Sequence, residues 1–249
     1  MSETVIQVTS LGKRIKGKTI LEDISFEINQ GDCVALIGPN GAGKTVLMSC
    51  ILGDKKPSGG QVLIDGKAGK AKNKIAVLLQ ENTIPNSLKV EELIAFFQSI
   101  SDNPLTNQEV QELLQFKEDQ YQQFADKLSG GQRRLLAFVL CLIDKPKILF
   151  LDEPTAGMDT STRQRFWEIV NDLKKSGVTI LYSSHYIEEV EHTADRILVL
   201  HQGKLIRDTT PYAMRHEEKE KQVTLPSSFV SIVHGLPDIY EITEKRDVI

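Results

Sequence analysis

The 249-residue sequence has no apolar run long enough to cross a membrane. Its longest such run, residues 135–143, is far shorter than the ~20 residues that a transmembrane helix needs. The first ten residues, MSETVIQVTS, have no basic start followed by an apolar stretch, so we expect no signal peptide. These absences predict a cytosolic protein that reaches a membrane only through a partner.

Cysteine is scarce, and the charge is nearly balanced. The three cysteines, Cys33, Cys50 and Cys141, lie in apolar surroundings without metal-ligand spacing, which predicts small buried hydrophobic side chains. This usage is typical of a reducing compartment. A net charge of -4 and a pI near 5.8 argue against a nucleic-acid partner, which would require a basic face.

The composition, 40% apolar and 26% charged, is that of a soluble globular protein. Short β-branched runs recur, and several are apolar at nearly every position, as in strands buried on both faces of a sheet. These runs occupy residues 5–8, 24–28, 33–38, 75–79, 147–152, 178–184 and 196–200. Helical patterns lie between them at residues 44–52, 160–175 and 187–193. The alternation predicts an α/β fold with a largely parallel central sheet.

Two regions depart from this alternation. Residues 86–143 have helical periodicity and no clear strand, which predicts a helical subdomain inserted between two core strands. Within it, LSGGQRR predicts an exposed, flexible entrance to the apolar helix at 135–143. After Pro211, we expect a solvated linker at residues 215–221 and a small strand–helix–strand tail. The expected domains are therefore 1–210 and 211–249.

A glycine-rich stretch, GPNGAGKT at residues 38–45, follows an apolar strand and opens a helix. This is a P-loop in the context that the motif requires. Its glycines let successive backbone N–H groups turn toward phosphate oxygens beside a helix N-terminus. Lys44 supplies a positive charge for the β- and γ-phosphates, and Thr45 offers a hydroxyl to Mg²⁺.

Two carboxylates follow a second apolar strand in KILFLDEP. They emerge at the carboxyl end of that strand, where open α/β sheets bind ligands. Asp152 is placed to hold Mg²⁺ through water, and Glu153 to orient or deprotonate an attacking water. Acidic residues also end strands as turn formers, but the preceding P-loop favours the functional interpretation.

The P-loop, LSGGQ and LFLDEP, in this order, resemble the nucleotide-binding subunit of an ATP-binding cassette (ABC) transporter. The resemblance covers about residues 4 to 210. It implies a P-loop NTPase core of mixed, largely parallel sheet with flanking helices, an antiparallel β subdomain and the helical insert. It further implies that Gln80 contacts Mg²⁺ and the attacking water, that Asp159 belongs to a dimer-facing D-loop, and that His185 contacts the γ-phosphate.

The same resemblance implies that two subunits pack head to tail when ATP is bound. A homodimer is expected, and a heterodimer remains open as the alternative. Ser129, Gly130, Gly131 and Gln132 of one subunit would then face the γ-phosphate held by the other. Glycine N–H groups, a hydroxyl and a helix N-terminus suit that anion. The full set expected to contact ATP in its own subunit is Gly38, Pro39, Asn40, Gly41, Ala42, Gly43, Lys44, Thr45, Val46 and Ile15.

Two positions depart from the family pattern. Ile15 stands where the family has an aromatic residue that stacks on adenine, and no aromatic occurs from residue 11 to 21. An aliphatic face can still pack against the base. Val46 replaces a common second threonine, so its backbone N–H remains and a hydroxyl contact to the α-phosphate is lost. Neither change affects the groups expected at the γ-phosphate.

The resemblance therefore predicts an ATPase that uses Mg²⁺ and drives a separate polytopic permease from the cytoplasmic face of the membrane. The insert resembles that of exporters of drugs, antibiotics or polysaccharides. An importer subunit and a soluble ATPase of iron–sulfur cluster assembly remain open as alternatives. The helical insert and the Gln80 region would contact the permease. Residues 94–97 could share that contact, although a core role is favoured.

Overall fold

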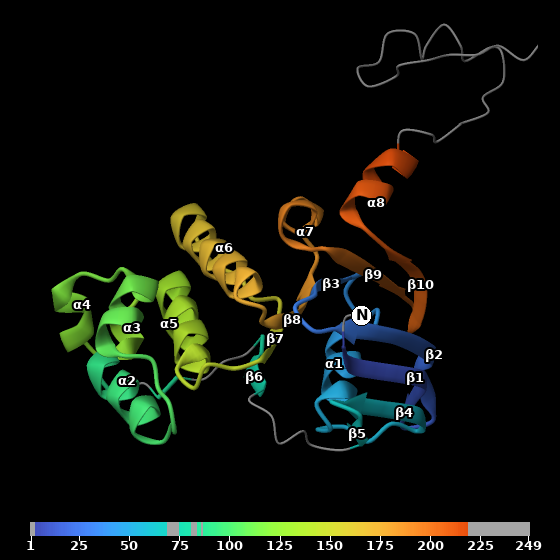
Figure 1. Cartoon of the computed structure of the whole chain (residues 1–249), viewed down its shortest axis with the longest axis horizontal. Coiled ribbons are helices and arrows are strands. Elements are labelled where there is room, and N and C mark those ends of the chain that lie inside the picture. Colours follow the sequence, from blue (N-terminus) through green and yellow to red (C-terminus); the bar gives the residue numbers. More distant parts are fainter. Residues whose placement is uncertain (1–2, 69–74, 81–83, 86, 219–249) are drawn as a thin grey trace, which may run out of the picture. The chain divides into compact units, whose positions relative to one another are not determined.

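The computed structural model describes residues 3–68, 75–80, 84–85 and 87–218 (Figure 1). The chain divides into two units, Met1–Pro211 and Tyr212–Ile249. Helix α8, Pro211–Glu218, includes residues 215–218, the first residues of the predicted linker, so these are helical; that the segment links two domains stays a prediction. Proline at a first helical position and the Ala, Met, Arg and Glu that follow favour a helix. The predicted tail lies outside the described residues.

A six-stranded sheet forms the centre of the first unit, in the order β10-β9-β3-β8-β7-β6. The inner pairs are parallel, and β10 alone pairs antiparallel, with β9. The bounds are β3 Cys33–Ile37, β6 Ile75–Leu78, β7 Ile148–Asp152, β8 Thr179–Ser184, β9 Arg196–His201 and β10 Lys204–Thr209. Every residue of β3, β7 and β8 is buried, in keeping with the apolar sequences of β3 and of β7 up to Asp152 and with the apolar centre of β8. The predicted parallel centre is confirmed.

A second, four-stranded sheet is antiparallel, in the order β2-β1-β4-β5. Its strands are β1 Thr4–Ile15, β2 Lys18–Asn29, β4 Gly59–Ile64 and β5 Lys67–Ala68. Helix α1, Lys44–Ile51, lies beside this sheet (Figure 1). Leu47 and Met48 of the helix share one hydrophobic core with Ile24 and Phe26 of β2. This packing fixes the start of α1, and with it the P-loop, between the two sheets.

The chain between β6 and β7 is helical in its described part, as expected, and its helices gather on one side of the first unit (Figure 1). They are α2 Val90–Ser99, α3 Asn107–Leu114, α4 Glu118–Gln122, the 3₁₀ turn η1 Ala125–Lys127 and α5 Gly130–Leu142. Helix α5 joins this group to the core. Its Phe138 ring lies 4.3 Å from the ring of Phe166 in α6, Thr160–Lys175, and both side chains are fully buried.

The exposed entrance predicted before α5 is only partly correct. Ser129 and Gly130 are exposed, but Arg134 is 9% exposed and lies inside the protein. In α2, the predicted core role fits Ile94, which is buried, and fails for Phe96, which is 54% exposed. Cys33 and Cys50 are buried, and Cys141 is half-buried. Within the described residues, no helix combines the length and the apolar character that a membrane crossing requires.

Candidate functional site

The P-loop connects β3 to α1 and passes close to β9. Gly38 has φ 156°, and a Cβ atom at this position would lie 2.1 Å from the carbonyl oxygen of Leu200. A side chain is therefore excluded there, and the loop backbone can turn closely over the sheet. Lys44 is the first residue of α1 and is 6% exposed. Its Nζ donates to the carbonyls of Gly38 at 2.8 Å and Pro39 at 3.4 Å.

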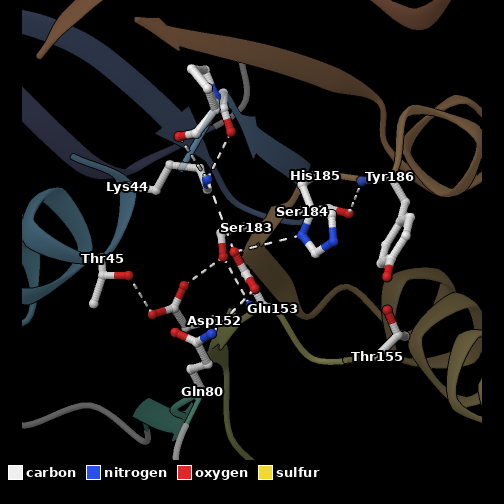
Figure 2. A network of polar contacts seen from close by, with 12 residues as sticks. Lys44, Thr45, Gln80, Asp152, Glu153, Thr155, Ser183, Ser184, His185 and Tyr186 are labelled. Carbon is white, nitrogen blue, oxygen red and sulfur yellow. Dashed lines mark hydrogen bonds and ion pairs between the residues drawn. The ribbon is translucent and has the colours of Figure 1, made fainter. Parts of the chain in front are cut away.

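A hydroxyl–carboxylate chain joins α1, β7 and β8. Thr45 Oγ1 donates to Asp152 Oδ2 at 2.8 Å, and Ser183 Oγ donates to Asp152 Oδ1 at 2.5 Å (Figure 2). Asp152 and Ser183 are register partners in the parallel β7–β8 pair. Both are buried, at 3% and 0% exposure. The Asp152 carboxylate is therefore fixed between the start of α1 and the end of β8.

Glu153 follows with a left-handed backbone, φ 45°. This conformation is uncommon for a residue other than glycine and costs on the order of 1 kcal/mol. Its N–H donates to Ser183 Oγ at 2.9 Å, so one hydroxyl holds both Asp152 and Glu153. The sharp turn ends β7 and directs the Glu153 side chain to the neighbouring elements (Figure 2).

The Glu153 carboxylate is the meeting point of the predicted hydrolytic residues (Figure 2). Gln80 Nε2 donates to its Oε2 at 3.3 Å, and His185 Nδ1 lies 3.6 Å from its Oε1. Lys44 Nζ is 4.0 Å from the same Oε1. These side chains come from the ends of β6, β7 and β8 and from the start of α1. The Glu153 side chain is 15% exposed, so ion pairing here is less screened than on the surface.

We call Ser129, Gly130, Gly131 and Gln132 the signature segment. This segment begins α5 with a reciprocal cap. Ser129 Oγ accepts the N–H of Gln132 at 3.2 Å, and Gln132 Oε1 accepts the N–H of Ser129 at 3.2 Å. The Gln132 side chain therefore stabilises its own helix end. The Ser129 hydroxyl proton remains available to an acceptor outside this cap. Ser129 and Gly130 are exposed, whereas Gly131 is buried.

Gly131 packs against the segment that precedes α6. A Cβ atom at Gly131 would lie 3.3 Å from Asp159 Oδ2 and 3.3 Å from Met158 Cα. Asp159 is the N-cap of α6 and accepts from Thr162 N at 3.0 Å and from Ser161 Oγ at 2.7 Å. These hydrogen bonds lower the pKa of Asp159, because they stabilise the charged form. The structure thus brings the signature segment and the D-loop of one chain together.

The remaining residues predicted to contact ATP lie in two parts of the chain, the P-loop with the start of α1 and the end of β1. Pro39, Asn40 and Gly41 are exposed, while Ala42 is buried and Gly43 precedes α1; all belong to the P-loop. The Val46 side chain packs against the hydrophobic core, so its backbone is what faces the loop. Ile15 lies at the end of β1, beside the turn to β2, and is 38% exposed.

Three polar residues that support the site have no role in the predictions from the sequence. They are Ser183, Thr155 and Glu189. Thr155 Oγ1 donates a hydrogen bond to Glu189 Oε2 at 3.0 Å. Arg163 Nε lies 3.5 Å from Glu189 Oε1, which ties α6 to α7, Ile187–Thr193. The signal for Ser183 was its place at the carboxyl end of a buried strand next to the one bearing Asp152.

The donor set fits Mg²⁺ held jointly with phosphates. Mg²⁺ prefers oxygen ligands and is usually bound by one or two carboxylates, waters and substrate phosphates. The Thr45 hydroxyl and the Asp152 carboxylate supply such oxygens, 2.8 Å apart, with the Gln80 amide nearby on Glu153. Among the described residues there is no group of three or more His, Cys, Asp and Glu placed to hold a metal by themselves.

Comparison with known proteins places this geometry in context. The family model described as "ABC transporter" matches residues 21–156. The probable multidrug ABC transporter ATP-binding protein YbhF of Escherichia coli (strain K12) is 30% identical over 244 residues, 93% of this chain. The chain spans only 42% of the length of that relative.

In two further comparisons, the similarity covers most of this chain and most of the other protein. The Nod factor export ATP-binding protein I of Rhizobium johnstonii is 33% identical over 228 residues, which is 88% of this chain and 73% of that protein. A solved structure of an ATP binding subunit of an ABC transporter superposes with a TM-score of 0.75 and 25% identity. That match covers 92% of this chain and 99% of the other.

We expect Ser183→Ala to lower both stability and any ATP hydrolysis. The substitution leaves a part-buried N–H of Glu153 and a buried oxygen of Asp152 without their partner, which costs about 1–3 kcal/mol. Chemical denaturation measures the free energy of unfolding. Ser176→Ala is the control, because this serine at the end of α6 is exposed and its hydroxyl donates to the backbone oxygen of Leu173. Equal stabilities of the two variants would contradict the role of Ser183.

Proposed function

The chain belongs to the ABC transporter family, and we propose that it is the ATP-hydrolysing subunit of a transporter. One observation carries the proposal. Lys44, Gln80 and His185 converge on the Glu153 carboxylate beside a P-loop. This arrangement combines a phosphate cradle, a candidate base and polar groups able to orient water. Those are the parts that phosphoryl transfer to water requires.

The residues would divide the reaction as follows. The P-loop N–H groups and Lys44 bind the β- and γ-phosphates, with Lys44 exchanging its loop carbonyls for phosphate oxygens. Glu153 accepts a proton from water as the water oxygen attacks the γ-phosphorus, and the bond to the β–γ bridging oxygen breaks to leave ADP. Gln80 and His185, from opposite sides of Glu153, orient the water and the γ-phosphate.

Thr45 and Asp152 would hold Mg²⁺, with Gln80 completing the set. When bound with ATP, Mg²⁺ neutralises charge on the β- and γ-phosphates. Ser183 keeps the Asp152 carboxylate oriented for this role through its hydrogen bond to Oδ1. Ile15 would cover the base by aliphatic packing alone. Val46 would contribute its backbone N–H.

The signature segment would complete the site of a second copy. Ser129 and Gly130 are exposed at the N-terminus of α5, where N–H groups and the helix dipole favour an anion. In a head-to-tail dimer, each γ-phosphate would lie between the P-loop of one subunit and Ser129 of the other. Asp159 would lie at the same interface. ATP would then join the two subunits, and hydrolysis would release them.

The subunit would act on a separate polytopic permease at the cytoplasmic face of the membrane. The described residues hold no helix able to cross a bilayer. The permease is proposed from the family to which the chain belongs. The names of two similar proteins, a probable multidrug transporter subunit and a Nod factor export subunit, favour export over import. The helical insert and the Gln80 region would contact the permease.

Glu153→Gln is expected to lower ATP hydrolysis by at least about 100-fold, because the amide cannot accept the proton from water. ATP binding should survive, so that ATP and Mg²⁺ convert the variant from monomer to dimer. Size-exclusion chromatography with light scattering measures this change. Lys44→Ala, which removes the phosphate-binding charge, should remain monomeric. A Glu153→Gln variant that stays monomeric at saturating ATP contradicts the head-to-tail model.

Ser129→Arg tests action between subunits. A bulky cation at this helix N-terminus should block the site of the partner and leave the P-loop of its own chain intact. Dimers mixed from Ser129→Arg and Glu153→Gln chains should retain one defective composite site carrying both changes and one unaltered site. We therefore expect residual hydrolysis in the mixture and none in either homodimer. Loss of both sites in the mixture would contradict the arrangement.

Purification of the tagged chain from native membranes tests the coupling to transport. A polytopic membrane protein should co-purify in stoichiometric amount and raise the ATPase rate of the chain. Lys44→Ala should retain the same membrane protein, since the contact surface is separate from the P-loop. Co-purification with proteins of iron–sulfur cluster assembly, and with no membrane protein, would overturn the transporter assignment. If the purified complex imported a substrate, the assignment to export would be contradicted, and the assignment to a transporter would stand.

A further inference from the structure

Arg134 in α5 holds the carbonyl groups at the ends of two neighbouring strands. Its Nη1 donates to the carbonyls of Leu79 and Gln80, the latter at 2.9 Å, just beyond β6. At the end of β7, Nη2 donates to Asp152 O at 3.0 Å and more weakly to Glu153 O at 3.4 Å. Nε donates to Pro154 O at 3.1 Å. One guanidinium therefore contacts the backbones of both Gln80 and Glu153.

A buried cation in this position needs a reason other than stability. Arg134 is 9% exposed, and burial of a charge is expensive unless hydrogen bonds compensate it. Burial lowers the pKa of the guanidinium, while the neighbouring Asp152 carboxylate raises it. Arginine nevertheless stays charged in proteins, because its ordinary pKa is above 12. Its planar fork of N–H donors matches a ring of carbonyl oxygens that an ammonium could not span.

The carbonyls that Arg134 binds flank a residue with a constrained backbone. Glu153 has the left-handed φ of 45°, which persists only where its surroundings enforce it. Ser183 fixes the N–H of Glu153 on one side, and Arg134 fixes the carbonyls around it on the other. The same arginine fixes the backbone of Gln80, whose amide meets the Glu153 carboxylate at 3.3 Å.

We propose that Arg134 is a positioning residue for hydrolysis, which sets Gln80 and Glu153 relative to each other and ties both to the signature segment. The connection to the signature segment follows from the position of Arg134 in helix α5. Arg134 lies one turn after Ser129 and Gly130 in α5, and the remainder of that helix is packed in the core. This inference rests on the proposed function, in which Ser129 serves the ATP of the partner. Arg134 thereby connects the ATP site of its own chain to the segment that completes the other site.

Arg134→Met and Arg134→Lys test the positioning role by steady-state kinetics on the full-length chain. Arg134→Met keeps the volume but donates no hydrogen bond, and we expect kcat to fall about 10- to 100-fold, as for other small misplacements of reacting groups. KM for ATP should change less than about threefold, because the P-loop contacts remain. Arg134→Lys retains the charge without the fork and should be folded but still impaired in kcat.

Arg165→Met is the matched control. Arg165 also donates to backbone carbonyls, those of Leu113 at 3.1 Å and of Glu112, but these lie at the end of α3. Its loss should lower thermal stability and leave kcat per folded molecule within about twofold. If the Arg134 variants match this control in kcat, the positioning role is overturned. A wild-type chain that does not hydrolyse ATP would instead overturn the proposed function.

The tie to the signature segment is measured in the Glu153→Gln background. Adding Arg134→Met should raise the ATP concentration needed for half-maximal dimerisation by about tenfold, since Ser129 and Gly130 lose a fixed position relative to the sheet. Adding Arg165→Met should leave that concentration unchanged. An unchanged midpoint with Arg134→Met would overturn the tie. Failure of Glu153→Gln alone to dimerise would overturn the head-to-tail model on which the tie rests.

Discussion

Parallel pairing of β6, β7 and β8 is the constraint on which the candidate site depends. Parallel strands end at the same edge of a sheet, so Gln80, Asp152 and Ser183 emerge side by side although they are far apart in the sequence. β3 runs parallel to β8 and delivers the P-loop to that edge as well. The apolar residues that bury these strands therefore determine where the polar ones meet. Shifting one register by one residue would separate Asp152 from Ser183.

At this edge, each charged side chain is stabilised by hydrogen bonds or ion pairs with neighbouring groups, and those neighbours are fixed by further contacts. Asp152 is nearly inaccessible to solvent, and its two oxygens are occupied by Thr45 and Ser183. Lys44 is equally buried and is held by loop carbonyls and by Glu153. A buried ion without such partners would cost several kcal/mol. The cluster is consequently held in a fixed geometry at the carboxyl edge of the sheet. In the proposed function, a phosphate would bind there with little rearrangement of the sheet.

How far the sequence predicts this structure depends on the kind of signal. Fully buried strands and amphipathic helices have strong local patterns, and residues 160–175 were predicted with the observed bounds of α6. Strands β4 and β10 were not located: β4 begins with two glycines, and β10 is a largely exposed edge strand with charged residues. Such strands are defined by pairing with distant partners, which a local pattern does not record.

The candidate site also contains residues that a sequence pattern reveals and residues that it does not. Lys44, Thr45, Asp152, Glu153, Gln80 and His185 belong to motifs whose order is visible in the sequence, and the structure brings them together. Arg134 belongs to the stretch LSGGQRR, which predicts an exposed, flexible entrance to the helix at residues 135–143. Its actual partners are carbonyl groups. Backbone acceptors have no sequence signature, so a side chain that binds them is found only from coordinates.

Two contacts join the signature segment to the hydrolytic edge of its own chain. Gly131 packs against Asp159, and Arg134 binds the carbonyls after β6 and β7. Both arise from the first turns of α5, whose later residues are packed tightly in the core. Close-packed interiors transmit a displacement rather than absorb it. In the proposed head-to-tail dimer, a phosphate that draws Ser129 toward a partner subunit would therefore also act on Glu153, and the signature segment would be part of two sites at once.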